Sequence, residues 1–148
     1  MESKYESLAL KNQLCFPIYL CSKEIIRRYG PMLDKLDLTY TQYITMMYMW
    51  EHNTCNVKEI SEALFLDSGT LTPLLKKLEA KGYITRNRSL KDERNLDVSI
   101  TDKGLSIRDV ALSVPCEMGK CMNLSDDEAK TLYSIMYKIL FNVKKEDE

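Results

Sequence analysis

Five cysteines are the residues of this chain that could do chemistry most readily: Cys15, Cys21, Cys55, Cys116 and Cys121. Their odd number and the lack of a CxxC spacing argue against a disulfide framework or a zinc site, and a single histidine, His52, adds little to a ligand set. We therefore expect no metal and no other cofactor. A cysteine can still act as a thiolate nucleophile where it is exposed and its pKa is low. Any special chemistry here should be thiol chemistry.

Length and composition indicate one ordinary globular domain. The chain has 148 residues, of which 45% are apolar and 29% are charged, values that exclude disordered and fibrous proteins. The longest mostly apolar stretch, Tyr43 to Trp50, is far shorter than the roughly 20 residues that span a membrane. The first six residues carry acids where a secretory signal would be basic and then apolar. We expect a cytoplasmic protein with no membrane partner.

The net charge of −1 conceals a strongly basic segment. Between Ser68 and Arg94, seven basic residues stand against three acidic ones, so this segment carries +4 and the remainder −5. A local positive charge of this kind is typical of a surface that binds a polyanion. A solvated charged hairpin is the alternative interpretation, and the order of the surrounding elements must decide.

Two helices are predicted before this segment. Apolar residues at helical spacing from Leu14 to Tyr29 predict a helix that ends at Gly30–Pro31, with Pro17 near its start and Cys15 at its entrance. Thr39 and Gln42 have the spacing of a capping box at the start of a second helix. Its interior is apolar almost all round, so we expect it to be buried on most sides.

The basic segment itself has the pattern of a helix-turn-helix followed by a hairpin. Asn56 begins a short helix that ends near Phe65, and Asp67 caps a helix with leucines at i, i+3, i+4 and i+7 that stops at Gly82. Residues 84–88 and the alternating residues 96–100 flank a polar loop, which predicts a β-hairpin. The fold class is therefore mainly α with a small β-hairpin wing, a winged helix-turn-helix.

Two further helices should complete the chain. Thr101 can cap a helix that ends near Pro115, and Ser125 with Glu128 forms a capping box for the last one. The apolar stripe of the last helix is longer than its own domain can cover, so we expect the first and last helices to bury each other in a two-fold homodimer. The predicted organisation is one domain over 1–148, with the winged helix-turn-helix over about 39–100 and dimerisation helices over 8–36 and 101–145.

Five stretches between about residues 12 and 104 follow one known pattern: Leu14 to Phe16, Tyr29 to Asp34, Leu38 to Tyr43, Trp50–Glu51, and Leu64 to Glu79, which contains the run Leu66 to Pro73. In these stretches the chain resembles the OhrR branch of the MarR family, the organic-hydroperoxide-resistance repressors. The run Leu66 to Pro73 is specific to the branch, whereas the wing sequence Asp92–Glu93–Arg94 is common to MarR proteins in general.

The resemblance implies a dimeric DNA-binding repressor that leaves its operator when an organic hydroperoxide oxidises one cysteine. Cys15 stands at the matching position, and Tyr29 and Tyr40 match the two tyrosines that support its thiolate, with Tyr19 as a further candidate. Pro17 departs from the small residue of the family pattern. A MarR repressor that a small aromatic ligand releases, without cysteine oxidation, is the alternative function.

A second cysteine could resolve the oxidised one. The family contains sensors with one cysteine, which end as mixed disulfides or overoxidise. It also contains sensors with two cysteines, which form a disulfide to a cysteine of the partner subunit that lies between the fifth and sixth helices. Cys116 and Cys121 lie in that connection, and we favour Cys121 with Cys116 as the alternative. Cys21 is about 9 Å along the helix from Cys15 and faces another way, so those two should not pair. Cys55 should be structural.

For DNA, the resemblance implies that the helix starting near Asp67 enters the major groove and the hairpin the minor groove. The candidate contacts on the helix are Ser68, Thr70, Thr72 and Lys76, with Lys77 at its flank. In the hairpin, Arg94 should enter the minor groove with Asp92 orienting it, while Arg86 and Arg88 should hold phosphates. An enzyme such as a thiol peroxidase would have no use for these elements, so no catalysis is expected.

Overall fold

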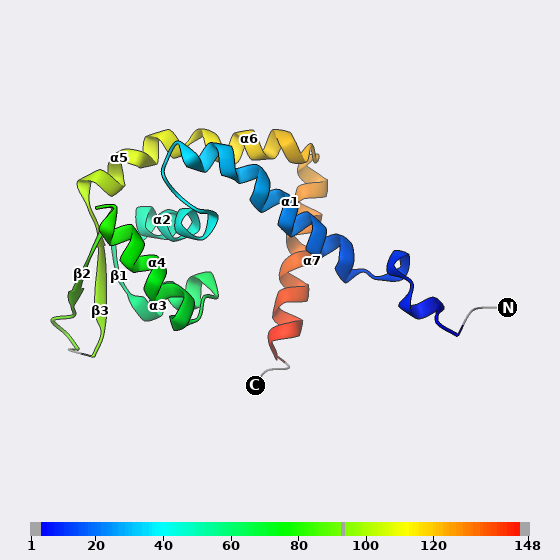
Figure 1. Cartoon of the computed structure of the whole chain (residues 1–148), viewed down its shortest axis with the longest axis horizontal. Coiled ribbons are helices and arrows are strands. Elements are labelled where there is room, and N and C mark those ends of the chain that lie inside the picture. Colours follow the sequence, from blue (N-terminus) through cyan, green and yellow to red (C-terminus); the bar gives the residue numbers. More distant parts are fainter. Residues whose placement is uncertain (1–3, 93, 146–148) are drawn as a thin grey trace. The chain divides into compact units, whose positions relative to one another are not determined.

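The computed structural model describes residues 4–92 and 94–145. These residues form helices and one small antiparallel sheet, which confirms the predicted fold class (Figure 1). Contacts divide the chain into two compact units, Met1–Val114 and Pro115–Glu148. In the described part, no helix is both long and apolar enough to cross a membrane.

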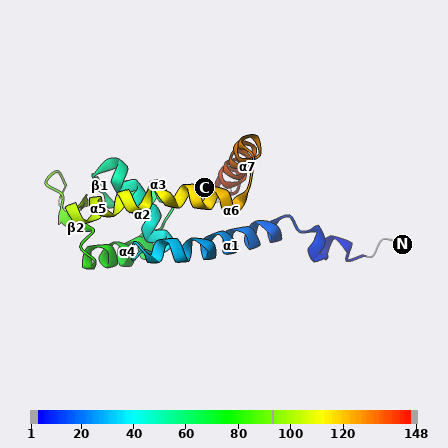
Figure 2. The ribbon, with the colours of Figure 1, turned by 90° about the horizontal axis from the view of Figure 1, so that it is seen from above.

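The first helix is longer than its sequence predicts. Two 3₁₀ turns, η1 (Glu6–Leu8) and η2 (Leu10–Asn12), precede α1 (Cys15–Asp34). The N-terminal end of α1 points away from α4 and the sheet (Figure 2). The predicted end at Gly30–Pro31 is wrong, because Leu33 and Leu36 beyond it are buried in the core. Burying two leucines contributes about 3 to 6 kcal/mol, enough to offset the roughly 3 kcal/mol cost of a proline inside a helix.

The predicted start of α1 is confirmed. The helix begins at Cys15, and Pro17 lies in its first turn, where a backbone N–H would have no partner within the helix. Cys15 is exposed at this end.

Helix α2 (Tyr40–His52) begins with the predicted capping box. The Gln42 side chain accepts from the Thr39 N–H at 3.1 Å, and the Gln42 N–H donates to the Thr39 hydroxyl at 3.4 Å. The expectation of burial on most sides is confirmed, because Tyr43, Met46 and Met49 are buried and Ile44, Tyr48 and Trp50 are half-buried. Met47 is the exception among these interior residues, with 45% exposure.

The winged helix-turn-helix contains one strand more than expected. Helices α3 (Val57–Leu64) and α4 (Ser68–Ala80) lead to β2 (Ile84–Arg88) and β3 (Leu96–Ile100), which pair as the predicted hairpin. The short β1 (Thr54–Asn56) pairs with the other edge of β3, which gives the order β1-β3-β2. Three residues are too few for an alternating pattern to be visible in a sequence.

Helix α5 (Asp102–Ala111) packs closely against the end of α4 and the sheet. A side chain on Gly104 would lie 2.2 Å from the Tyr83 carbonyl oxygen, so only glycine fits there. The Trp50 indole donates to the Gly104 carbonyl at 2.8 Å. The predicted cap, Thr101, accepts from the Gly104 N–H.

The last helices differ from expectation at one place. Pro115 does not follow the end of a helix but lies in the first turn of α6 (Ser113–Met122). Cys116 and Cys121 are therefore on a helix, and the prediction that they lie in a connection between two helices is wrong. Helix α7 (Asp126–Lys144) starts at the predicted Ser125–Glu128 capping box, and none of its residues is buried.

Candidate nucleic-acid interface and cysteine site

Helix α4 presents one apolar and one polar face. Leu71, Leu75 and Leu78 are buried to 1% exposure or less. The predicted contact residues all lie on the exposed side: Ser68, Thr70, Thr72, Lys76 and Lys77. Side chains at i, i+4 and i+8 share a helix face, so Ser68, Thr72 and Lys76 form one row.

The N-terminal cap of α4 uses part of this set. Asp67 accepts from the Thr70 N–H at 2.8 Å and from the Thr70 hydroxyl at 3.1 Å. These hydrogen bonds lower the pKa of Asp67, so its carboxylate stays charged at the positive end of the helix. The Thr70 hydroxyl would have to leave the cap to donate to a base.

The loop between β2 and β3 is ordered by its own polar groups. Asp92 accepts from the Arg94 N–H at 3.1 Å and from the Asn95 side chain at 3.3 Å, and Ser89 donates its N–H to the Asn95 carbonyl. Asp92 therefore orients Arg94 through the backbone. The side chains of Arg88 and Arg94 are exposed. Glu93, part of the wing motif, lies outside the described residues.

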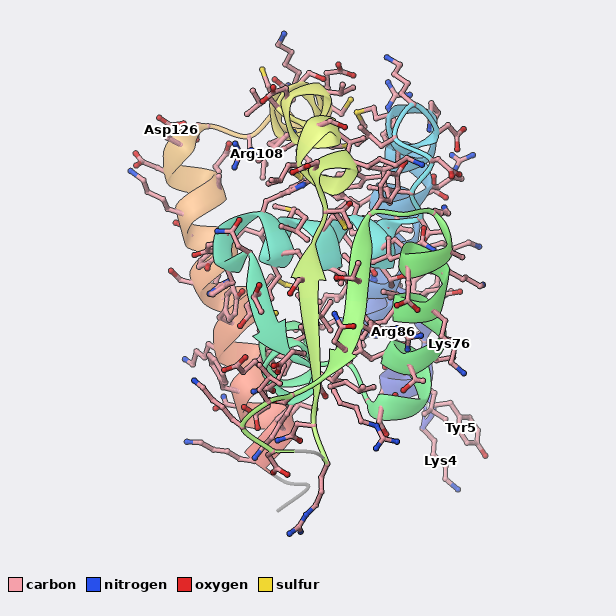
Figure 3. The ribbon with its side chains drawn as sticks, turned by 90° about the vertical axis from the view of Figure 1, so that its left-hand side faces the viewer. Lys4, Tyr5, Lys76, Arg86, Arg108 and Asp126 are labelled. Atoms are coloured by element: carbon pink, nitrogen blue, oxygen red, sulfur yellow. The ribbon has the colours of Figure 1, made fainter. Side chains whose placement is uncertain are left out.

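Arg86 is placed differently from the prediction. Its guanidinium donates to one carboxylate oxygen of Glu79 from Nε at 3.0 Å and from Nη2 at 2.6 Å. The backbone N–H of Arg86 donates to the other oxygen at 3.0 Å. Figure 3 shows Arg86 between β2 and α4, while Lys76 lies on α4 itself. With a side chain 17% exposed and bound to a carboxylate, Arg86 does not have the geometry predicted for a phosphate contact.

The end of α1 is tied to the end of α4 by residues that the sequence did not single out. Tyr83 donates its hydroxyl to the Leu36 carbonyl at 2.9 Å in the core. The Lys81 ammonium binds the Asp37 carbonyl, the Asp37 carboxylate at 3.2 Å and the Gln42 side chain at 3.2 Å. Lys81 and Tyr83 have no local motif, since their partners lie about 40 residues earlier in the chain.

The cysteines fall into two groups. Cys15, Cys21, Cys116 and Cys121 are exposed, whereas Cys55 in β1 is 7% exposed and contacts the Met49 sulfur at 3.4 Å. Burial, followed by the charges of Glu59 and Asp97, raises the pKa of Cys55 to about 11. Cys55 is thus an unreactive thiol at neutral pH, which agrees with its predicted structural role.

Tyr29 and Tyr40 lie together, far from Cys15 of the same chain. Their ring centroids are 4.9 Å apart, and Tyr43 lies 6.0 Å from Tyr29. Burial, with Tyr40 adding to it, raises the pKa of Tyr29, so its hydroxyl remains a hydrogen-bond donor. Tyr19, by contrast, is on the turn after Cys15 and is 60% exposed.

Among the described residues, no group of three or more histidine, cysteine or acidic side chains comes together in a way that could hold an ion.

Comparison with known proteins places this geometry in a family. The family of the transcriptional regulators SarA and Rot matches residues 27–110. The organic hydroperoxide resistance transcriptional regulator of Bacillus subtilis is 44% identical over 140 residues, which are 95% of each chain. The chain belongs to the MarR family of transcriptional regulators. Its resemblance to the OhrR branch is confirmed by the same relative.

Other relatives of this MarR regulator agree. SarZ of Staphylococcus aureus is 46% identical over 127 residues, 86% of each chain. The structure of reduced AbfR bound to DNA covers 99% of this chain and 100% of its own, with a TM-score of 0.83 and 30% identity. AbfR is also known overoxidised on DNA and with a disulfide formed, at TM-scores of 0.77 and 0.66 and at 33% and 31% identity. These two structures cover 95% and 92% of this chain and 99% and 96% of their own.

Proposed function

We propose that this regulator is a homodimeric repressor that releases its DNA operator when an organic hydroperoxide oxidises Cys15. The observation that carries the proposal is the exposed Cys15 at the first residue of α1. An exposed thiol is accessible to a peroxide, as a cysteine that senses one must be. The likeness to a hydroperoxide resistance regulator and to AbfR in several oxidation states supports it.

The DNA contacts of the proposal come from α4 and the wing. The row Ser68, Thr72 and Lys76 can reach base edges and phosphates in the major groove. Arg94, on the exposed loop between β2 and β3, can enter the adjacent minor groove. Arg88 can contact a phosphate. AbfR, which shares the fold, has been solved on DNA.

Exposed apolar side chains on the terminal helices support the homodimer. On α7, Leu132, Ile135, Met136 and Phe141 are each at least 40% exposed. At the start of α1 and along it, Leu14, Tyr19, Leu20 and Ile26 are 39% to 72% exposed. Exposed large apolar side chains in such number are typical of an interface, and a two-fold dimer is the commonest way to bury them. The proposed organisation is a winged helix-turn-helix flanked by dimerisation helices.

The chemistry needs only a peroxide and the thiolate. The Cys15 sulfur attacks one peroxide oxygen, the O–O bond breaks, and the leaving alkoxide takes a proton to become an alcohol. Sulfur is thereby oxidised by two electrons to a sulfenic acid, and the peroxide is reduced. A second thiol can then displace hydroxide from the sulfenic acid, which forms a disulfide and water.

The ties between α1 and α4 offer a way to transmit this event. Tyr83 and Lys81 hold the residues that follow α1, Leu36 and Asp37, against the end of α4. A rotation of α1 would therefore carry the winged helix with it as one body. In a dimer such a rotation changes the spacing of the two α4 helices, and with it the fit to an operator.

Operator binding with and without cumene hydroperoxide tests the proposal. The operator would be selected from random DNA by the reduced protein. We expect wild-type protein and Cys21→Ser to bind and then dissociate on oxidation, and Cys15→Ser to bind but stay bound. Cys21 is a matched control because it is exposed on the same helix. Peroxide-induced release of Cys15→Ser would refute Cys15 as the sensor, and release only by small aromatic compounds would support the ligand-gated alternative.

A further inference from the structure

We propose that Glu79 and Arg86 are positioning residues for DNA binding, which hold the wing at a fixed angle to α4. The proposal rests on the DNA-binding half of the proposed function and does not depend on the cysteine. It assigns Arg86 a role inside the protein where a phosphate contact was predicted.

The geometry links two elements that must touch DNA together. Glu79 lies in the last turn of α4, and Arg86 is the middle residue of β2, opposite the buried Val98 of β3. One carboxylate binds Arg86 through three hydrogen bonds, two to the guanidinium and one to the backbone N–H. Two guanidinium donors on one carboxylate oxygen and the backbone N–H on the other oxygen together define both the distance and the orientation of the strand relative to the helix. The strand cannot pivot on α4 without breaking these hydrogen bonds.

The exposure of neighbouring residues supports this role. Thr85, Asn87 and Arg88 of the same strand are exposed, whereas the Arg86 side chain is turned towards α4 (Figure 3). The hydrogen bonds from Arg86 lower the pKa of Glu79, so the pair is fully charged at neutral pH. Ion pairs between fully solvated side chains contribute little, but this one is shielded on its arginine side.

Two of the three acidic residues of the basic segment, Glu79 and Asp92, acquire a common explanation. An acid on a DNA-binding surface repels phosphates, so each one weakens binding unless it has another use. Asp92 orders the tip of the wing by binding the Arg94 N–H. Glu79 orders the strand end of the wing, nearest to α4, by binding Arg86.

The substitution Glu79→Gln tests the proposal by the sign of its effect. If Glu79 acted only through its charge, removing that charge would tighten operator binding. We expect the opposite, a loss of affinity of roughly tenfold, because the amide cannot hold the guanidinium as a carboxylate does. Glu62→Gln on α3 is the control, since its pair with Lys58 is exposed and 3.7 Å long.

The salt dependence of binding separates positioning from phosphate contact. Losing one phosphate contact lowers the slope of log K against log salt concentration by about 1. We expect Arg86→Gln to lose affinity like Glu79→Gln with an unchanged slope, and the double variant to lose no more than either single variant. Urea unfolding followed by the fluorescence of Trp50 checks that each variant is folded.

The charge exchange Glu79→Arg with Arg86→Glu provides a second, independent measurement. We expect it to recover part of the affinity that either single substitution loses. Unchanged or tighter binding by Glu79→Gln, or a slope reduced by about 1 in Arg86→Gln, would overturn the positioning role. If wild-type protein selected no operator at all, the proposed function would fail instead.

Discussion

Cys15 and Tyr29 lie on one uninterrupted helix, 14 residues and hence about 21 Å apart along its axis. Tyr40 is held beside Tyr29 at 4.9 Å between ring centroids, so it is equally remote from that cysteine. Within one chain, neither hydroxyl can support the thiolate. If these tyrosines act on Cys15, they act on the cysteine of the partner subunit.

Mixed dimers test this consequence. We expect a dimer of one Cys15→Ser subunit and one subunit carrying Tyr29→Phe and Tyr40→Phe to react with peroxide, because the intact cysteine meets intact tyrosines across the interface. Support within one chain would leave no complete site in this dimer. Differently tagged subunits allow its purification, and labelling of the sulfenic acid measures the rate. A rate no higher than that of the Tyr29→Phe, Tyr40→Phe homodimer would contradict action between subunits.

Arg94 is exposed at the tip of the ordered wing, so its loss should act on DNA alone. We expect Arg94→Ala to weaken operator binding by about 1 to 3 kcal/mol and to lower the salt slope by about 1. Titrations at several salt concentrations measure both quantities. Arg108→Ala on α5, which is exposed outside the basic segment, is the control. Equal effects of the two substitutions would mean that Arg94 contributes only general charge.

The fate of oxidised Cys15 depends on a second thiol. We expect a disulfide-linked dimer on non-reducing gels, which Cys121→Ser abolishes and Cys21→Ser does not. Cys21 is about 240° around α1 from Cys15, so those two cannot pair without unfolding. Because α6 is a helix, Cys121 must either be presented by it or be freed by local unwinding.

Other outcomes of this oxidation identify other mechanisms. Loss of the crosslink in Cys116→Ser alone would make Cys116 the partner thiol. Absence of any crosslink, with a small thiol found on Cys15 by mass spectrometry, would indicate a sensor with a single cysteine.

The buried thiol of Cys55 should make stability depend on alkaline pH. Its pKa is raised to about 11, so the folded protein keeps a proton that the unfolded chain releases. The unfolded state then binds fewer protons, and the free energy of unfolding falls as the pH rises from about 9 to about 11. Urea midpoints across this range should fall less steeply for Cys55→Ala than for wild type. Tyrosine ionisation affects both proteins alike, so parallel curves would contradict the assignment.

Local chemistry explains why much of this regulator could be predicted from its sequence. The capping residues Thr39, Asn56, Asp67 and Ser125 bind backbone groups within three residues, and each starts the helix that its spacing predicts. The leucine stripe of α4 and the alternation of β3 likewise reflect burial on one side of one element. Such patterns also placed the polar face of α4 and the start of α1 at Cys15.

Only the tertiary structure decided features whose partners are remote along the chain. Helix α1 continues past Pro31 because Leu33 and Leu36 find a core made by other elements. Arg86 pairs with Glu79 because a strand and a helix meet there, although the predicted hairpin counted Arg86 among the DNA contacts. The ties from Lys81 and Tyr83 to residues 36, 37 and 42 likewise have no local signal. A sequence pattern records which face of an element is buried, but the neighbour that buries it is determined only when the chain folds.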